Sequence, residues 1–356
     1  MSTGEPDDVA LVRAVAAAAK LDQISGRWAS APSPEQPIVL SVMRNERPRI
    51  ADFLQHYRRL GIRHFAIIDN GSTDGTREYL AAEPEVRLFA AEGRFDWRRK
   101  HGWIMHVIER FGRDRWYLLC DADEHCVFAG SDAAPLSRLV SLLDSQGRRR
   151  ARGALVDMYR EGPMAAWARP PDEPLRAWYP FFDAGTYREH RNVRLTSRSG
   201  GPRQRAMGHL DPEFRPELTK YPLFRLATGE VAYNPHLIWP PAPEADDPCL
   251  IGILHYKFDL DLFARLHDAV DSGQYWNASS EYAIYLEYLR SDPEAGLFGH
   301  ASHRYESADD LLKFRIIQHI ENATRISAHT MGRGLADDIT KAVHCRRAEA
   351  LRGVAS

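Results

Sequence analysis

Features that would place a protein in a special class are scarce in this sequence. Its 356 residues include four cysteines, and their spacing matches no metal-binding motif. These are Cys120, Cys126, Cys249 and Cys345. Cys120 lies in an apolar run, where a reduced thiol behaves as a small hydrophobic side chain. This cysteine usage favours a reducing compartment over a disulfide scaffold.

Long hydrophobic runs and an excess of charge are also missing. No stretch approaches the roughly 18 uninterrupted apolar residues of a membrane-spanning helix. The acidic start and the short Ala-rich segment after it lack the basic beginning and long apolar centre of a secretion signal. The net charge is −2, from 47 basic and 49 acidic side chains, which argues against nucleic acid as a partner. We therefore expect a cytoplasmic protein, with peripheral docking at the inner face of a membrane left open.

What is present is an ordinary globular composition, with 44% hydrophobic and 27% charged residues. We expect a helix from Val9 to Leu21 and then a linker rich in proline and serine, together making up residues 1–37. Residues 38–150 and 151–270 are predicted to be two halves of one domain. Residues 271–356 are predicted to form a helical extension, because amphipathic patterns cover 281–289 and 309–326. An amphipathic pattern of the same kind predicts a further helix at 260–270, at the end of the second half.

Apolar runs alternate with amphipathic segments in the first of these halves. Strands are predicted at 38–43, 64–68, 86–89 and 116–120. Helices are predicted at 49–60 and 98–110, and another follows the loop that ends at Thr76 and runs to about residue 82. Further strands are expected at 154–159 and 252–257. Because this alternation is typical of β-α-β units, we predict an α/β fold with a mostly parallel central sheet flanked by helices.

The apolar run from Trp116 to Cys120 is followed by three carboxylates, Asp121, Asp123 and Glu124. They lie where a buried strand would emerge, at the sheet edge where α/β proteins bind ligands. On an extended backbone Asp121 and Asp123 would point the same way and could share a divalent cation. A helix cap or a solvated acidic turn is the alternative. The Asp-x-Asp spacing alone is not specific, since Asp259-Leu260-Asp261 repeats it.

Two other polar motifs follow predicted strands. The first is Met43-Arg44-Asn45-Glu46, and the second is the loop from Ile68 to Thr76. Each could be a solvated turn or a helix cap when taken alone. Together with Cys120-Asp121-Ala122-Asp123-Glu124 they resemble the nucleotide-sugar glycosyltransferases of the family-2 type. The likeness is closer to a bacterial branch whose acid motif is Asp-x-Asp-Glu.

The resemblance covers about residues 38–128, is looser from 154 to about 266, and implies the GT-A fold. In that fold a Rossmann-like nucleotide-binding half is completed by a mixed acceptor-binding half, here with C-terminal helices. The resemblance implies contacts to the donor nucleotide from residues in each motif. They are Arg44, Asn45, Glu46, Asp69, Asn70 and Asp121. Asn70 stands where many relatives have aspartate.

A basic cluster from Gly93 to His101 is predicted to help bind the donor, and we select Arg98 and Arg99 because guanidinium groups bind phosphate bidentately. Such clusters are more often solvated helix faces. The resemblance implies that Asp121, Asp123 and His255 hold Mn²⁺ or Mg²⁺; His236 is a weaker choice than His255. For the catalytic base we name Asp157 and Asp183, because both lie beside apolar residues that could raise a pKa.

The sequence thus predicts a metal-dependent glycosyltransferase of hexosyltransferase type. It would move a sugar from a nucleoside-diphosphate donor, with UDP-sugars favoured, to an acceptor hydroxyl, inverting the anomeric centre, in polysaccharide or glycoconjugate synthesis. The acceptor could be a saccharide, a lipid-linked molecule or a protein. A sugar-nucleotide nucleotidyltransferase would share the sheet and the acids, but it should carry a Gly-rich phosphate loop near the first strand. A non-catalytic scaffold that binds sugar or a partner is the other alternative.

Overall fold

The computed structural model describes residues 5–170, 173–191, 196–242, 247–259, 266 and 280–320. They belong to one compact unit, Met1–Ile320. The elements of its first part are α1 (Asp7–Ala18), β1 (Asp22–Ser25), β2 (Ile38–Met43), α2 (Arg47–Arg59), β3 (Phe65–Asp69), α3 (Thr76–Ala82), β4 (Val86–Ala90), α4 (Trp97–Phe111), β5 (Tyr117–Leu119), β6 (Glu124–Phe128) and α5 (Leu136–Ser145).

The second part is built mainly from short strands. Its elements are β7 (Arg150–Asp157), η1 (Met164–Ala166), α6 (Leu175–Trp178), β8 (Phe181–Asp183), β9 (Arg188–Arg191), β10 (Thr196–Ser199), α7 (Gly201–Met207), β11 (Thr219–Phe224), β12 (Val231–Asn234), β13 (Leu237–Trp239), β14 (Ile251–His255), α9 (Ser280–Ser291), β15 (Ser302–Arg304) and α10 (Ala308–Lys313).

A single nine-stranded sheet runs through both parts, in the order β1-β4-β3-β2-β5-β11-β7-β14-β6. The pairings β4-β3, β3-β2, β2-β5 and β7-β14 are parallel. The strands β1, β11 and β6 run antiparallel to their neighbours. The expected α/β fold with a mostly parallel sheet and flanking helices is therefore confirmed. Of the three antiparallel strands, β1 and β6 belong to the first part and β11 to the second.

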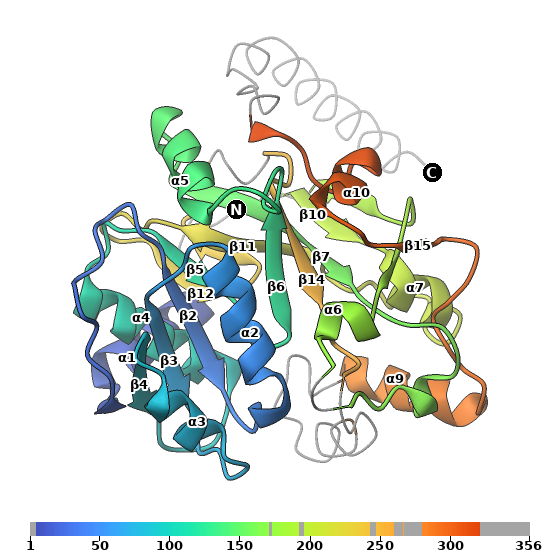
Figure 1. Cartoon of the computed structure of the whole chain (residues 1–356), viewed down its shortest axis with the longest axis horizontal. Helices are drawn as coiled ribbons and strands as arrows, with labels where there is room; N and C mark the ends of the chain where they lie inside the picture. Colours follow the sequence, from blue (N-terminus) through green and yellow to red (C-terminus); the bar gives the residue numbers. More distant parts are fainter. Residues whose placement is uncertain are drawn as a thin grey trace, which may run out of the picture. The chain divides into compact units, whose positions relative to one another are not determined.

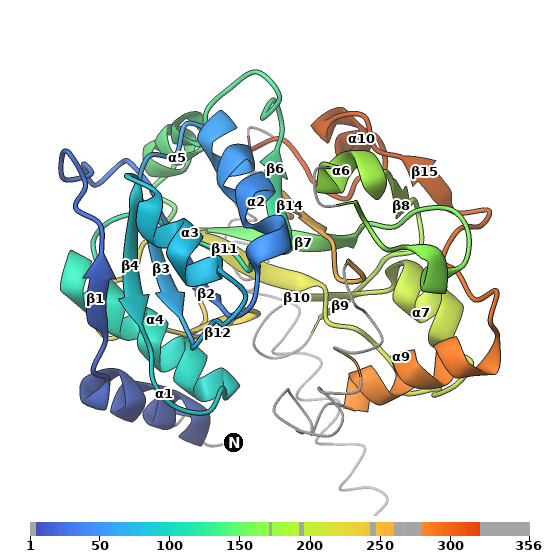
Figure 2. The same ribbon diagram turned by 60° about the horizontal axis from the view of Figure 1, so that its bottom comes forward.

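Helices cover both faces of the parallel strands, as Figures 1 and 2 show, with α2 on one face and α4 on the other. Ile38 and Leu40 of β2 and Ile68 of β3 pack in one core with Val12 of α1 and Ile104 of α4. Double coverage explains why these strands are continuous apolar runs in the sequence. Among the described residues, none of the helices combines the length and the hydropathy needed to cross a bilayer.

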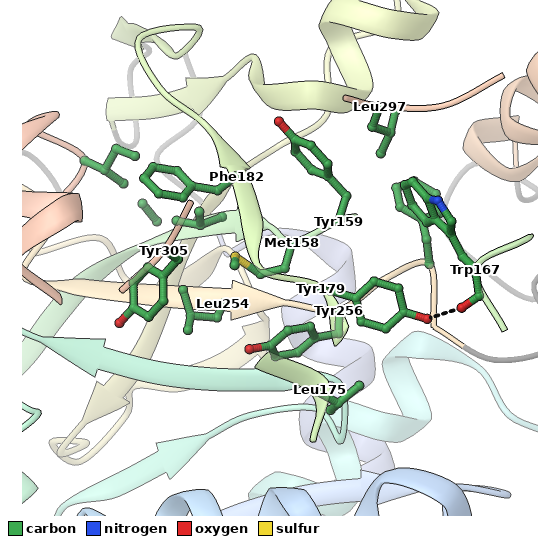
Figure 3. Close-up of a cluster of buried hydrophobic side chains, with 14 of the residues drawn as sticks. Met158, Tyr159, Trp167, Leu175, Tyr179, Phe182, Leu254, Tyr256, Leu297 and Tyr305 are labelled. Atoms are coloured by element: carbon green, nitrogen blue, oxygen red, sulfur yellow. Dashed lines mark hydrogen bonds between the residues drawn. The ribbon is translucent and has the colours of Figure 1, made fainter. Parts of the chain in front are cut away.

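A second core lies in the other part of the unit and is rich in aromatic side chains (Figure 3). Tyr159, Phe182 and Tyr256 are completely buried there, and the hydroxyl of Tyr179 donates a hydrogen bond to the carbonyl of Trp167 at 2.8 Å. Of five aromatic residues in this part of the sequence, Trp167, Tyr179 and Phe182 are thus buried in packing. The other two, Trp178 and Phe181, pack partly buried against the same core.

The structure corrects several predicted boundaries. The first helix ends at Ala18, and Leu21 precedes a strand, β1, that the sequence did not predict. The strand expected at 154–159 is β7, Arg150–Asp157. The sequence analysis also missed β6 and α5. The helix predicted at 260–270 lies outside the described residues apart from 266, as does the part of the 309–326 helix beyond 320.

Candidate active site at the carboxyl edge of the sheet

The loops after β2 and β3 are joined by hydrogen bonds between backbone and side chains. Thr73 donates its amide to Oδ1 of Asn45 at 2.9 Å, and Asn45 donates its own amide to Ser72. Asn45 has a φ of 57°, in the left-handed region that asparagine tolerates. The amide of Arg47 donates to Asp74 at 3.0 Å. The amide of Glu46 donates to Thr76 Oγ1 at 2.8 Å, so Asn45, Glu46 and Arg47 together hold the two loops. The side chain of Arg44 is exposed.

Asp69 and Asn70 end β3 as buried polar residues. The carboxylate of Asp69 accepts from Arg77 Nε at 2.7 Å and from the amide of Ser72. The side-chain Nδ2 of Asn70 donates to the backbone carbonyls of Ala91 and Gly93. The Oδ1 atom of Asn70 is buried and has no hydrogen-bond partner among the described residues. The predicted nucleotide role of Asp69 and Asn70 remains a prediction.

The acid motif does not continue the strand. Residues 122 and 123 form a turn, and the amide of Glu124 donates to the carbonyl of Asp121 at 3.1 Å. The expectation that alternation makes Asp121 and Asp123 point the same way is wrong, because it assumed extended backbone. Instead Asp121 contacts Lys100, whereas Asp123 lies beside His255.

Two lysines from distant elements surround Asp121. Lys100 of α4 donates to Asp121 Oδ1 at 2.5 Å, and Lys220 of β11 lies 3.9 Å from Oδ2. Burial on its own would raise the pKa of Asp121, but Lys100 and Lys220 outweigh it and lower the pKa. A small pocket opens here, lined by Lys100, His101, Asp121, Lys220 and Tyr221, among others. This pocket combines an ionised acid with two cations.

Glu124 is almost completely buried and is held from both sides. Its Oε1 accepts from Lys220, and its Oε2 accepts from the amide of Asp121. Burial opposes the charge of Lys220, but Glu124 and Asp121 outweigh it and raise the lysine pKa. Lys220 is therefore charged at neutral pH.

A candidate metal centre lies beside this pair. Asp123, Glu124 and His255 each offer a ligand atom, and these atoms all lie within 4.8 Å of one another. The strand pairing explains the convergence, because His255 at the end of β14 stands opposite Glu124 in β6. Carboxylate oxygens with one imidazole suit Mn²⁺, and also Mg²⁺, better than they suit a sulfur-seeking metal. The sequence named Asp121, Asp123 and His255 for this role, and in this group Glu124 stands in place of Asp121.

Asp157 orients the histidine of this centre. Its Oδ1 lies 2.8 Å from Nδ1 of His255, and its Oδ2 accepts from Arg203 Nε at 2.7 Å. Burial would raise the pKa of Asp157, yet Arg203 and His255 lower it far below its usual range. The Nε2 atom of His255 is thereby turned toward Asp123, 3.8 Å away. A carboxylate behind a histidine is the usual arrangement around metal-binding imidazoles.

A buried arginine that the sequence analysis overlooked connects the acid motif to α2. The side chain of Arg49 is only 2% exposed and lies 3.5 Å from Asp123, 3.1 Å from Glu46 and 3.6 Å from Asp259. Arg169 pairs with the same Asp259 at 3.2 Å. The second Asp-x-Asp, at 259–261, therefore contributes Asp259 to this network.

The other predicted site residues lie in different surroundings. Arg98 pairs with Asp8 of α1 at 2.8 Å, and Arg99 is exposed. Asp183 is completely buried and accepts from Tyr159 and from two nitrogens of Arg205. Within the basic cluster it is Lys100, one residue further along, that reaches the acid motif. Its position in the first turn of a helix facing this edge was the signal that could have identified it.

Known proteins resemble this chain only in part. No family model matches it. A stretch of 92 residues, 26% of the chain, is 45% identical to Glycosyltransferase AglJ of Haloferax volcanii, and the match covers 29% of that relative. Similar solved structures include Rv0371c from Mycobacterium tuberculosis, with 16% identity, a TM-score of 0.22 and coverage of 35% of this chain and 65% of that one. An apo UDP-glucose pyrophosphorylase is 8% identical, with a TM-score of 0.25 and coverage of 46% of this chain and 67% of that one. The sequence match relates part of this chain to a glycosyltransferase, and the two structures are too dissimilar to support an argument.

Proposed function

We propose that this protein is a metal-dependent glycosyltransferase of the GT-A type. It takes a sugar from a nucleoside-diphosphate donor, with UDP-sugars favoured, and transfers it to an acceptor hydroxyl with inversion, in polysaccharide or glycoconjugate synthesis. The observation that carries the proposal is the meeting of Asp123, Glu124 and His255 within 4.8 Å, at the edge where β5 ends. The partial identity to a glycosyltransferase supports the same conclusion.

The chain's own residues suit a nucleotide diphosphate. Among the described residues none donates to the buried Oδ1 of Asn70, and an N–H of a nucleobase is the partner we propose for it. Lys100 and Lys220 line the pocket at Asp121, and ammonium groups stabilise phosphate oxygens. Mn²⁺ or Mg²⁺ held by Asp123, Glu124 and His255 would neutralise charge on the departing diphosphate. The acids and the cations thus serve the leaving group and not the acceptor.

We propose that neither Asp157 nor Asp183 is the base for the acceptor hydroxyl. Asp157 is ionised and bonded to His255 and Arg203, so we propose that it positions the histidine. Both oxygens of Asp183 are occupied by Arg205, a geometry that suits structural support. The two earlier candidates for the base are thus reinterpreted on the same ground: each already holds a guanidinium group.

The test is release of nucleoside diphosphate from a panel of UDP-, GDP- and dTDP-sugars in the presence of Mn²⁺ or Mg²⁺. We expect release from one donor, loss of release with EDTA, and a loss of about 100-fold or more in Asp123→Asn, because transition-state charge is worth several kcal/mol. Asp114→Asn is the matched control, since the side chain of Asp114 is 77% exposed, and it should behave like the wild type.

Several outcomes would contradict the proposal. Release that EDTA and Asp123→Asn leave unchanged would exclude the assigned centre. Formation of a nucleotide sugar from a nucleoside triphosphate and a sugar phosphate would establish the nucleotidyltransferase alternative. A heat-shift assay that detects no binding of any nucleotide sugar, together with no release, would leave the scaffold as the better hypothesis.

A further inference from the structure

Two buried cysteines face each other across the acid motif. Cys120 directly follows β5 and Cys126 lies in β6, and their Sγ atoms are 3.2 Å apart. Both are free thiols, and each is 1% exposed. A disulfide bond is about 2 Å long, so the two sulfurs need to approach by only about 1 Å to be joined. The fold therefore holds a pair of thiols within range of a covalent bridge.

The segment between the two cysteines, 121–125, carries two of the three candidate metal ligands, Asp123 and Glu124. Helix α2 holds the same segment, because the hydroxyl of Tyr57 accepts from the amide of Cys126 at 3.3 Å and donates to the carbonyl of Glu124 at 2.8 Å. A bridge would close this segment into a covalent ring. The movement that it needs exceeds the roughly 0.2 Å by which the ligand distances of a metal site vary, so the bridge would distort the group of ligands.

The pocket at Asp121 gives a small oxidant a route to this pair. Cys120 is among the residues that line it, together with Lys100 and Lys220. Because both thiols are buried, hydrogen peroxide suits this route better than a bulky disulfide does. Burial also raises the pKa of the Cys120 thiol, so the thiol is protonated at neutral pH and its oxidation is slow.

We propose that Cys120 and Cys126 form a reversible disulfide that weakens metal binding by the acid motif. The effect on the metal rests on the proposed function, whereas formation of the disulfide does not. Bridges of this kind occur in reducing compartments as transient, redox-sensing modifications. The pair is thus a modification site that couples the state of the candidate active site to peroxide.

The chemistry needs one peroxide molecule for each bridge. Peroxide transfers one oxygen to the sulfur of Cys120, which gives a sulfenic acid, and its other oxygen leaves as water. The sulfur of Cys126 then attacks that of Cys120, the S–O bond breaks, and a second water departs. Two thiols and one peroxide thus give one disulfide and two waters. A dithiol reverses the bridge by thiol–disulfide exchange and is itself oxidised.

The first measurement is the intact mass of the full chain carrying Cys249→Ala and Cys345→Ser, which leaves Cys120 and Cys126 as its cysteines. The protein is exposed to hydrogen peroxide for hours and then denatured with N-ethylmaleimide. We expect a loss of two hydrogen atoms and no added maleimide, and two added maleimides when a dithiol is applied first. Cys126→Ser in the same background is the matched control and should form no internal bridge.

The second measurement is Mn²⁺ affinity, from electron paramagnetic resonance of free Mn²⁺. We expect the oxidised protein to bind Mn²⁺ roughly tenfold more weakly than the reduced protein, or weaker still, with recovery after a dithiol. Cys126→Ser should bind Mn²⁺ like the reduced protein before and after peroxide. Because the main comparison uses one protein in two oxidation states, it does not depend on how a variant folds.

The outcomes separate this inference from the function. Two thiols that still react with maleimide after peroxide would overturn the disulfide. A disulfide that leaves Mn²⁺ affinity unchanged would overturn its effect on the metal and leave the transferase proposal standing. A reduced protein that neither binds Mn²⁺ nor releases nucleoside diphosphate would overturn the proposed function and the effect on the metal together, while the mass still decides whether the bridge forms.

Discussion

Asp157 illustrates how a buried acid can act through its neighbour. It is 1% exposed, and its two oxygens are divided between His255 and Arg203. Its pKa lies well below the ordinary value, so it stays ionised, whereas a general base works best with a pKa near the operating pH. What it can do is fix the ring of His255, with Nε2 turned toward Asp123.

Asp157→Asn tests that role. An asparagine keeps the size but supports the imidazole less well, so we expect Mn²⁺ affinity in the presence of donor to fall by roughly 10- to 100-fold. The Mn²⁺ dependence of donor hydrolysis should shift accordingly, while kcat at saturating Mn²⁺ stays near that of the wild type. Arg203 keeps Glu281 as a partner, which favours folding of the variant.

A different pattern would restore the original hypothesis for Asp157. If kcat at saturating Mn²⁺ collapses for transfer to an acceptor, while metal affinity and hydrolysis are unchanged, Asp157 would be the base after all. Asp114→Asn again provides the control for loss of an acid at an exposed position.

Among the elements, α1 and α4 are held in unusually close contact, side by side in Figure 2. Gly102 of α4 makes this possible, because a Cβ built there would lie 2.3 Å from Cγ1 of Val15 and 3.2 Å from the amide nitrogen of Ala16. Through α1 this contact also positions Asp8, the partner of Arg98. The helix predicted from the first residues is thus part of the folded core.

Gly102→Val should separate the two helices. Overpacking at a buried contact costs roughly 1–3 kcal/mol, so the free energy of unfolding in urea should fall by that amount. Ala10→Val adds a similar side chain at an exposed position of α1 and should change stability much less. Unchanged stability of Gly102→Val would show that α1 does not pack tightly on α4 in solution.

For the whole molecule, buried neutral histidines tie stability to pH. Burial, aided by Lys100 for His101 and by Arg59 for His125, lowers the pKa of each to about 3 from an ordinary 6.5. Between these values the unfolded chain binds protons that the folded one does not. Stability contributed by these groups is therefore complete above about pH 6.5 and is lost as the pH falls toward 3.

Urea unfolding at pH 7 and pH 5 should show this loss, with up to about 1.4 kcal/mol per pH unit from each histidine. His101→Gln can still donate to the carbonyl of Ala232, as Nδ1 of His101 does at 2.8 Å, but it does not titrate. We expect a smaller difference between the two pH values for this variant. His300→Gln, at an exposed position, should keep the wild-type difference, and an equal loss in all three proteins would contradict the assignment.

The sequence alone determined the alternation of strands and helices from Ile38 onward and the position of the acids after a buried strand. Those features depend on residues close together in the chain, so hydrophobic periodicity and turn residues were enough to predict them. The metal-ligand candidates Asp123 and His255 were also named from local motifs and a family resemblance. β6 was missed because Glu124 and His125 begin it, and both are polar residues buried by partners elsewhere.

Only the tertiary structure decided how those residues are combined. The pairing of β14 with β6 and β7 sets His255 beside Glu124 and Asp157, and a turn at 122–123 sends Asp121 toward Lys100 and away from His255. The basic residues that pair with the acids, Arg49, Lys100 and Lys220, come from α2, α4 and β11, and of these only Lys100 had a local signal in its position at the start of a helix. Charge balance in a buried cluster depends on distances between segments far apart in the chain, and folding alone fixes those distances.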